Sequence, residues 1–73
     1  MKLPMLSGEE IVKILKKIGF QEIRQRGSHR YMRHTDGRTT VVPIHSNRDI
    51  GRGLLKKILN DVDVTREEFM KYL

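Results

Sequence analysis

Residues 20–44, FQEIRQRGSHRYMRHTDGRTTVVPI, alternate between polar and apolar side chains in three short runs. Alternation with a period of two is typical of β-strands, because successive side chains of a strand point to opposite faces. We therefore expect strands from Phe20 to Arg26, from His29 to His34 and from Thr39 to Ile44.

Two turn signals separate these runs. Gly27-Ser28 is a two-residue loop with glycine first, which suits a type II′ hairpin turn, and Asp36-Gly37 is a second hairpin signal. Pro43 lacks the backbone donor that a ladder needs, so the third strand is expected to lie at a sheet edge or to end there. Three strands joined by two tight turns form an antiparallel meander.

Helical patterns flank the meander on both sides. Ser7 to Glu10 has the form of a capping box that starts a helix, and Gly19 is a typical helix end. A second helix should open at Gly53, and a second capping box, Thr65 to Glu68, should open a short C-terminal helix. The apolar residues that recur at helical spacing are Ile11, Ile14, Leu15 and Ile18, and later Leu54, Leu55, Ile58 and Leu59.

The order of elements is thus helix, three antiparallel strands, helix and short helix. A meander must bury one apolar face, and the two longer helices are the available cover. We expect an α+β fold, a two-layer sandwich in which the second face of the sheet stays open. Double-stranded RNA-binding domains have the same element order. Residues 1–73 are expected to form a single domain, because so short a chain supports one small core.

The composition narrows the class of partner. Fifteen Lys and Arg against nine Asp and Glu give a net charge of +6, which on so small a surface attracts polyanions, nucleic acid first. The chain has no cysteine, so a disulfide framework and a thiolate zinc site are excluded. No signal peptide or membrane span is recognisable, and the expectation is a soluble cytoplasmic protein. The domain is too small to enclose a large cofactor, and none is expected.

Arginines are concentrated in and just after the meander. Only Glu22 and Asp36 oppose them there, whereas the lysines lie mainly in the helices. An arginine fork can hold phosphate with two hydrogen bonds and can stack on a base, so this segregation favours a phosphate-binding sheet. A solvated basic face without a ligand is the alternative. The six arginines are Arg24, Arg26, Arg30, Arg33, Arg38 and Arg48.

Three histidines lie in the same segment and are its only side chains that normally titrate near neutral pH. His29 directly follows the Gly27-Ser28 turn, where the missing side chain of Gly27 lets a sugar-phosphate backbone approach. It is the best-placed candidate for proton transfer, although an ordinary strand-start histidine is the simpler alternative. His34 is expected to be a solvated strand-end residue, and His45 either binds phosphate, supports His29 or caps its loop.

Tyr31 should share a sheet face with His29, two residues away, where it could stack on a base. A core position is the more conservative expectation for this tyrosine.

Metal-dependent cleavage is not favoured, because the basic segment lacks the clustered carboxylates that hold magnesium. Metal-free RNA cleavage uses the ribose 2′-hydroxyl as the nucleophile, so the protein needs to move protons and to stabilise charge on phosphate. A histidine among arginines suits that chemistry.

Several motifs together resemble the HicA (YcfA-like) family of toxins. They are Gly19-Phe20, Arg26-Gly27-Ser28-His29-Arg30, His34-Thr35-Asp36-Gly37-Arg38, Val41-Val42-Pro43-Ile44-His45, and Gly53 before the Leu54 to Leu59 helix. The resemblance extends from the first helix to Glu67-Glu68-Phe69. Leu54 departs from it, because relatives often have a small hydroxyl residue after the glycine, and a leucine cannot cap the second helix as that residue would.

The resemblance implies a toxin with a double-stranded-RNA-binding-like fold that cleaves messenger RNA independently of translation. It implies His29 as the catalytic histidine and a HicB antitoxin that covers the site. The resemblance and the basic segment together indicate that no metal takes part in cleavage. They also indicate RNA contacts by Arg24, Arg26, Gly27, Ser28, Arg30, Arg33, Arg38, His45 and Arg48. Two alternatives stay open: a non-catalytic double-stranded RNA-binding module, and a protein-interaction domain whose basic sheet docks an acidic partner.

Overall fold

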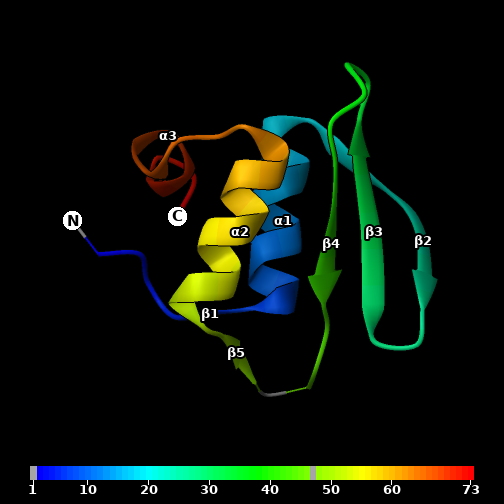
Figure 1. Ribbon diagram of the computed structural model, residues 1–73, viewed down its shortest axis with the longest axis horizontal. Helices are drawn as coiled ribbons and strands as arrows, with labels where there is room; N and C mark the ends of the chain where they lie inside the picture. The colour runs from blue at the N-terminus through cyan, green and yellow to red at the C-terminus, as the bar shows by residue number, and fades with distance from the viewer. Residues whose placement is uncertain (1, 47) are drawn as a thin grey trace.

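The predicted order of elements is confirmed in a computed structural model that describes residues 2–46 and 48–73 (Figure 1). The main sheet has the antiparallel order β2-β3-β4, so β2 and β4 are its edges. Its strands are β2 (Phe20–Arg26), β3 (His29–His34) and β4 (Thr39–Pro43), and the helices are α1 (Gly8–Ile18), α2 (Arg52–Val62) and α3 (Arg66–Met70).

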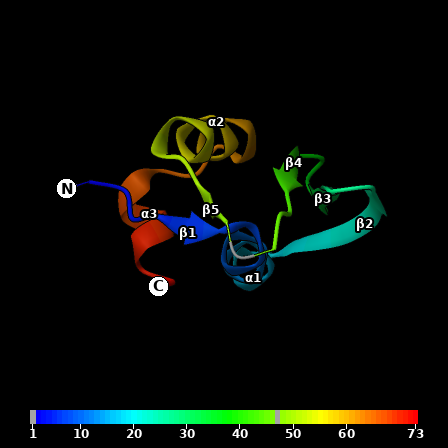
Figure 2. The same ribbon diagram turned by 90° about the horizontal axis from the view of Figure 1, so that it is seen from below.

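Both long helices lie on the same side of this sheet, which makes the expected two-layer α+β sandwich (Figure 2). Between the layers, the strands contribute Phe20, Met32 and Val42, each at most 2% exposed. The helices contribute Ile11, Leu15, Leu55 and Ile58, which are equally buried. Within the described residues, no helix has the length and apolar content needed to cross a bilayer.

The first helix begins as expected. The Glu10 amide donates to Ser7 Oγ at 3.2 Å, and the Ser7 amide donates to Glu10 Oε1 at 2.9 Å, so the capping box is complete. Thr65 caps α3 by accepting from the Glu68 amide at 3.1 Å, which is one of the two bonds of the predicted capping box. These caps satisfy backbone donors that have no partner inside a helix.

A second, two-stranded sheet was not expected. It pairs β1 (Leu6–Ser7) with β5 (Asp49–Ile50) and ties the chain after β4 to the start of α1. Strands of two residues leave no periodic pattern in a sequence, which explains why it was missed. The α2 helix then starts at Arg52 after an N-cap at Gly51 that makes no side-chain cap bond, one residue earlier than predicted.

Both predicted hairpin turns are present. Arg26 pairs with His29 across the two-residue loop, and Gly27 has φ +57°, as the first position of a type II′ turn requires. Strand β4 is an edge and ends at Pro43, one residue before the predicted end.

Gly19, which ends α1, has φ +120° and lies against the ring of His34. A Cβ at this position would come within 2.8 Å of His34 Nε2. Gly37, in the β3–β4 turn, has a similar φ of +99° but nothing within 4 Å of its would-be Cβ. A side chain at either glycine would therefore be strained by the backbone conformation, and only at Gly19 would it also be crowded.

We expect Gly37→Ala to lower the free energy of unfolding by about 1 kcal/mol, the cost of an L-residue at positive φ. Gly19→Ala should lower it by about 1 kcal/mol more, because the His34 ring must also move. Urea unfolding of both variants measures the difference. Equal losses would mean that the Gly19–His34 contact does not constrain the fold.

Candidate nucleic-acid interface

The two faces of the main sheet are distinguished by burial. Met32 on β3 and Thr40 and Val42 on β4 are buried and point toward the helices. Their immediate neighbours in the strands point to the opposite side, which none of the described helices covers (Figure 2). We call this side the open face. Its paired rows are Gln21, Arg33 and Thr39; Arg24, Tyr31 and Val41; and Arg26, His29 and Pro43.

A β-bulge determines which arginines lie on the open face. Glu22 pairs with Met32 and Arg24 pairs with Tyr31, which leaves Ile23 without a partner. One extra residue reverses the side on which all later side chains of the strand emerge. Without the bulge, Arg24 would share the helix side with Glu22.

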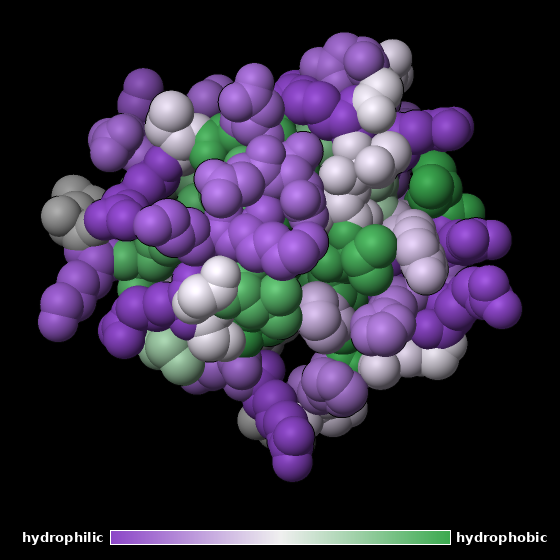
Figure 3. Space-filling view, in the orientation of Figure 1, coloured by the Kyte–Doolittle hydropathy of each residue, from purple (hydrophilic) through white to green (hydrophobic). Residues whose placement is uncertain are grey.

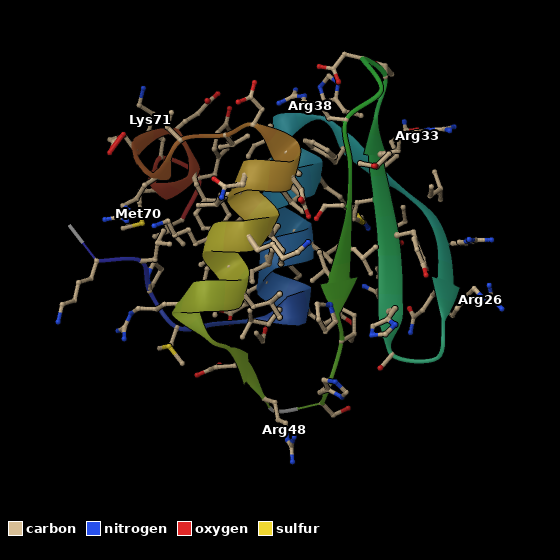
Figure 4. All side chains as sticks on the ribbon, in the orientation of Figure 1. Arg26, Arg33, Arg38, Arg48, Met70 and Lys71 are labelled. Carbon is tan, nitrogen blue, oxygen red and sulfur yellow. The ribbon has the colours of Figure 1, made fainter. Side chains whose placement is uncertain are left out.

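The open face is basic. Arg24, Arg26 and Arg33 are exposed on it, and its paired rows contain no carboxylate. Figure 4 shows Arg26 and Arg33 extending from the sheet away from the helices. In Figure 3, hydrophobic side chains form separate groups among hydrophilic ones.

Tyr31 lies on the open face together with His29, as the alternation predicts, and the expected core position is wrong. Its ring is covered by the Arg24 guanidinium, whose central carbon is 4.8 Å from the ring centroid. Ile23 and Val41 beside it are 47% and 37% exposed. A hollow of about 400 Å³ is lined by these three residues together with Met32, Thr39, Thr40, Lys57 and Asp61.

His29 is exposed at the start of β3, directly opposite Arg26. The Ser28 carbonyl in the adjoining turn accepts a hydrogen bond from the Ile44 amide at 2.6 Å. This bond holds the chain after β4 against the turn, so His45, the next residue, follows directly and is exposed. Arg48 is also exposed, and its amide donates to the His45 carbonyl at 3.2 Å. The Ile44–Ser28 bond thus places His45 beside the turn that precedes His29, whereas Arg48 lies further along the loop and extends away from the sheet (Figure 4).

His34 is a packed residue and not the solvated strand end that was predicted. Its ring meets Phe20 edge-on, with 5.2 Å between centroids, and its Nδ1 accepts from the Asp36 amide at 3.2 Å. The side chain is 21% exposed. These contacts tie the β3–β4 turn to the core and leave His29 and His45 as the exposed histidines of the described chain.

Arg30 emerges on the helix side and is held there by two carboxylates. Its guanidinium contacts Glu9 at 2.6 Å and Glu22 at 2.9 Å, and its side chain is 15% exposed. The hydrogen bond from Arg30 holds the pKa of Glu9 below its usual value, and the same bond raises the pKa of Arg30. Arg30 therefore links β3 to α1, on the side opposite His29.

Arg38 is likewise held by contacts within the protein. It contacts Asp36 at 2.9 Å, donates to the Val62 carbonyl at 2.6 Å and lies 5.2 Å over the Phe20 ring. Hydrogen bonds from Arg38 lower the pKa of Asp36. Of the six predicted arginines, the sheet thus gathers Arg24, Arg26 and Arg33 on one face, and Arg30 and Arg38 are bound elsewhere.

Among residues 2–46 and 48–73, no three His, Cys, Asp or Glu side chains are grouped so that they could hold a metal ion. On the open face, the available chemistry is one imidazole, three guanidiniums and one aromatic ring. Such a set can bind phosphate and transfer protons.

Comparison with known protein families gives a match that covers most of the chain. Residues 8–64 match the family model described as the HicA toxin of bacterial toxin-antitoxin systems. The match extends from α1 through the whole sheet to the end of α2. A search of curated proteins found no match.

We expect the Arg30–Glu9 pair to make stability depend on acid pH. A carboxyl whose pKa is lowered by folding stabilises the folded state above its unfolded pKa, and this stabilisation is lost as the pH falls below about 4.5. When the pH is lowered from about 7 to about 3, the free energy of unfolding should therefore fall less for Arg30→Gln than for the wild type. Urea unfolding at both pH values measures this, with Arg26→Gln, which emerges on the open face, as the control. An equal loss in all three proteins would contradict the role of the pair.

Proposed function

The chain belongs to the HicA family, toxins of bacterial toxin-antitoxin systems, and on this basis we propose that it is a metal-independent endoribonuclease that cleaves messenger RNA independently of translation. Membership of the family makes the chain a toxin with an antitoxin partner. The finer proposal is carried by one observation: His29 is exposed on the open face among Arg24, Arg26 and Arg33.

In this proposal the RNA supplies its own nucleophile. The ribose 2′-oxygen attacks the adjacent phosphorus as its proton leaves, and the bond from phosphorus to the 5′-oxygen of the next nucleotide breaks as that oxygen gains a proton. The His29 imidazole performs one of these two proton transfers, because an imidazole has one nitrogen that can accept a proton and one that can donate a proton. The arginines stabilise the negative charge that develops on the phosphate.

The turn before His29 favours close approach of the RNA backbone. Nothing lies within 4 Å of the position that a Cβ of Gly27 would occupy, so the phosphate has free access there. Arg26 on the other side of the turn lies directly opposite His29, and directly paired residues of an antiparallel sheet are about 5 Å apart at their Cβ atoms. One phosphate can therefore contact both side chains.

We propose that the RNA-binding surface consists of Arg24, Arg26, Gly27, Ser28 and Arg33, with His45 and Arg48 at its margin. Arg30 and Arg38, also predicted from sequence, are assigned here to holding the fold, because each already has a carboxylate partner. We further propose that the antitoxin is of the HicB type and covers the open face. Covering this face would block both phosphate binding and access to His29.

We expect His29→Ala and His29→Gln each to reduce RNA cleavage by at least about 100-fold, the contribution of one positioned acid-base group. RNA affinity should change little, because the neighbouring arginines remain. Cleavage rates of a labelled transcript and binding isotherms measure the two quantities separately, with Thr39→Ala on the same face as the control.

A wild-type protein free of antitoxin that leaves RNA intact, with or without divalent metal, would overturn the enzymatic proposal. RNA binding in that experiment would indicate the non-catalytic RNA-binding module. No binding at low salt would favour a protein-interaction domain.

The open-face arginines should each contribute one phosphate contact. Arg26→Gln and Arg33→Gln are each expected to flatten the slope of log affinity against log salt by about 0.7, the value for one contact with a single strand. Lys17→Gln, which removes an equal charge from the exposed surface of α1, should leave the slope unchanged. Equal flattening by all three substitutions would indicate a general charge effect and not this face.

A further inference from the structure

The stack of Arg24 on Tyr31 has no part in the proton transfers proposed above. It lies in the centre of the open face, in the row next to His29. Exposed Ile23 and Val41 flank it, so an aromatic ring and two aliphatic side chains lie together in the centre of a basic face. Solubility does not explain an aromatic ring and two exposed aliphatic side chains grouped at one place.

We propose that this cluster, Ile23, Arg24, Tyr31 and Val41, is a platform on which an unpaired RNA base stacks beside the scissile phosphate. The inference rests on the proposed function, since it names the form of substrate that His29 would cut. The base contributes stacking and apolar contact, and the surrounding arginines hold the phosphates on either side. The substrate is consequently single-stranded where it is cleaved.

The spacing supports this assignment. Tyr31 is two residues from His29 on the same strand face, about 7 Å along β3. A phosphate at His29 and a base at Tyr31 can therefore belong to the same or adjacent nucleotides. Ile23, Tyr31 and Val41 line part of a hollow of about 400 Å³ that continues to Lys57 and Asp61 on α2, and this volume lies within the size range of small-ligand sites.

The chemistry of the cluster favours an unpaired base over a duplex. In double-stranded RNA the base faces are already stacked on one another, and proteins recognise the duplex through phosphates and 2′-hydroxyls. An aromatic ring would have no base to contact there. Single strands expose their bases, which stack on aromatic rings and guanidinium planes with little sequence preference.

The test compares protein variants on RNA with and without bases. One probe is a short 2′-O-methyl oligoadenylate, and the other is the same backbone with abasic sugars. Neither has a free 2′-hydroxyl, so neither can be cleaved by the proposed chemistry. The proteins are the wild type, Tyr31→Leu, which keeps an apolar side chain, and Tyr31→Phe, which keeps the ring. Affinities are measured after circular dichroism has shown that each variant is folded.

We expect the wild type to bind the base-bearing probe about 10-fold more tightly than the abasic one, a usual gain for one stacked base. Tyr31→Leu should lose most of this gain and bind the abasic probe like the wild type. Tyr31→Phe should resemble the wild type on both probes. Arg24→Lys should weaken binding of the base-bearing probe more than Arg26→Lys does, because only Arg24 lies over the ring.

Equal wild-type affinity for both probes would overturn the platform, whether or not the leucine variant folds. Equal weakening of both probes by Tyr31→Leu would also overturn it, since the ring would then serve the fold alone. A 2′-O-methyl duplex bound as tightly as the single strand would refute the single-stranded substrate. These results concern binding, so they are distinguishable from a failure of His29 to cleave.

Discussion

Burial of Met32 in the middle of β3 is the constraint on which the rest of this sheet depends. Its side chain is fully buried between the sheet and the helices. In a strand with one buried face, a slip of one residue would turn every buried side chain outward and every outward one inward. The position of Met32 therefore fixes His29, Tyr31 and Arg33 on the open face and Arg30 on the helix side.

The sheet also separates its charges. On the helix side of the sheet, Glu9 and Glu22 neutralise Arg30. In the turn between β3 and β4, Asp36 pairs with Arg38. The bulge at Ile23 then directs Arg24 and Arg26 away from these carboxylates. A chain with a modest excess of positive charge thus presents a face whose rows contain cations and no carboxylate, which concentrates its attraction for phosphate.

The two groups of arginines have different roles because their charged partners differ. Arg30 and Arg38 connect elements that are distant in the sequence, and their partners keep them from binding phosphate with the same freedom as exposed arginines. Arg24, Arg26 and Arg33 surround a histidine and a tyrosine, which suits binding of an RNA backbone with an adjacent base. The proposed cleavage needs no deep pocket, because the RNA would supply its own nucleophile.

Local patterns in the sequence predict the three helices, the three strands of the main sheet and their order, because caps, turns and periodic patterns involve only neighbouring residues. The capping box of Ser7 and Glu10 begins α1, and Gly27 forms the turn before His29. The alternation of side chains in β3 places His29 and Tyr31 on one face of the sheet. The family resemblance added the toxin assignment. The bulge at Ile23, the β1–β5 pair, the packing of His34 and the partners of Arg30 and Arg38 become visible only in the folded structure. Each of these features depends on which residues meet across the fold. The bulge in particular leaves no signal in the sequence, because a strand as polar as β2 has no regular alternation of apolar residues that a bulge would interrupt.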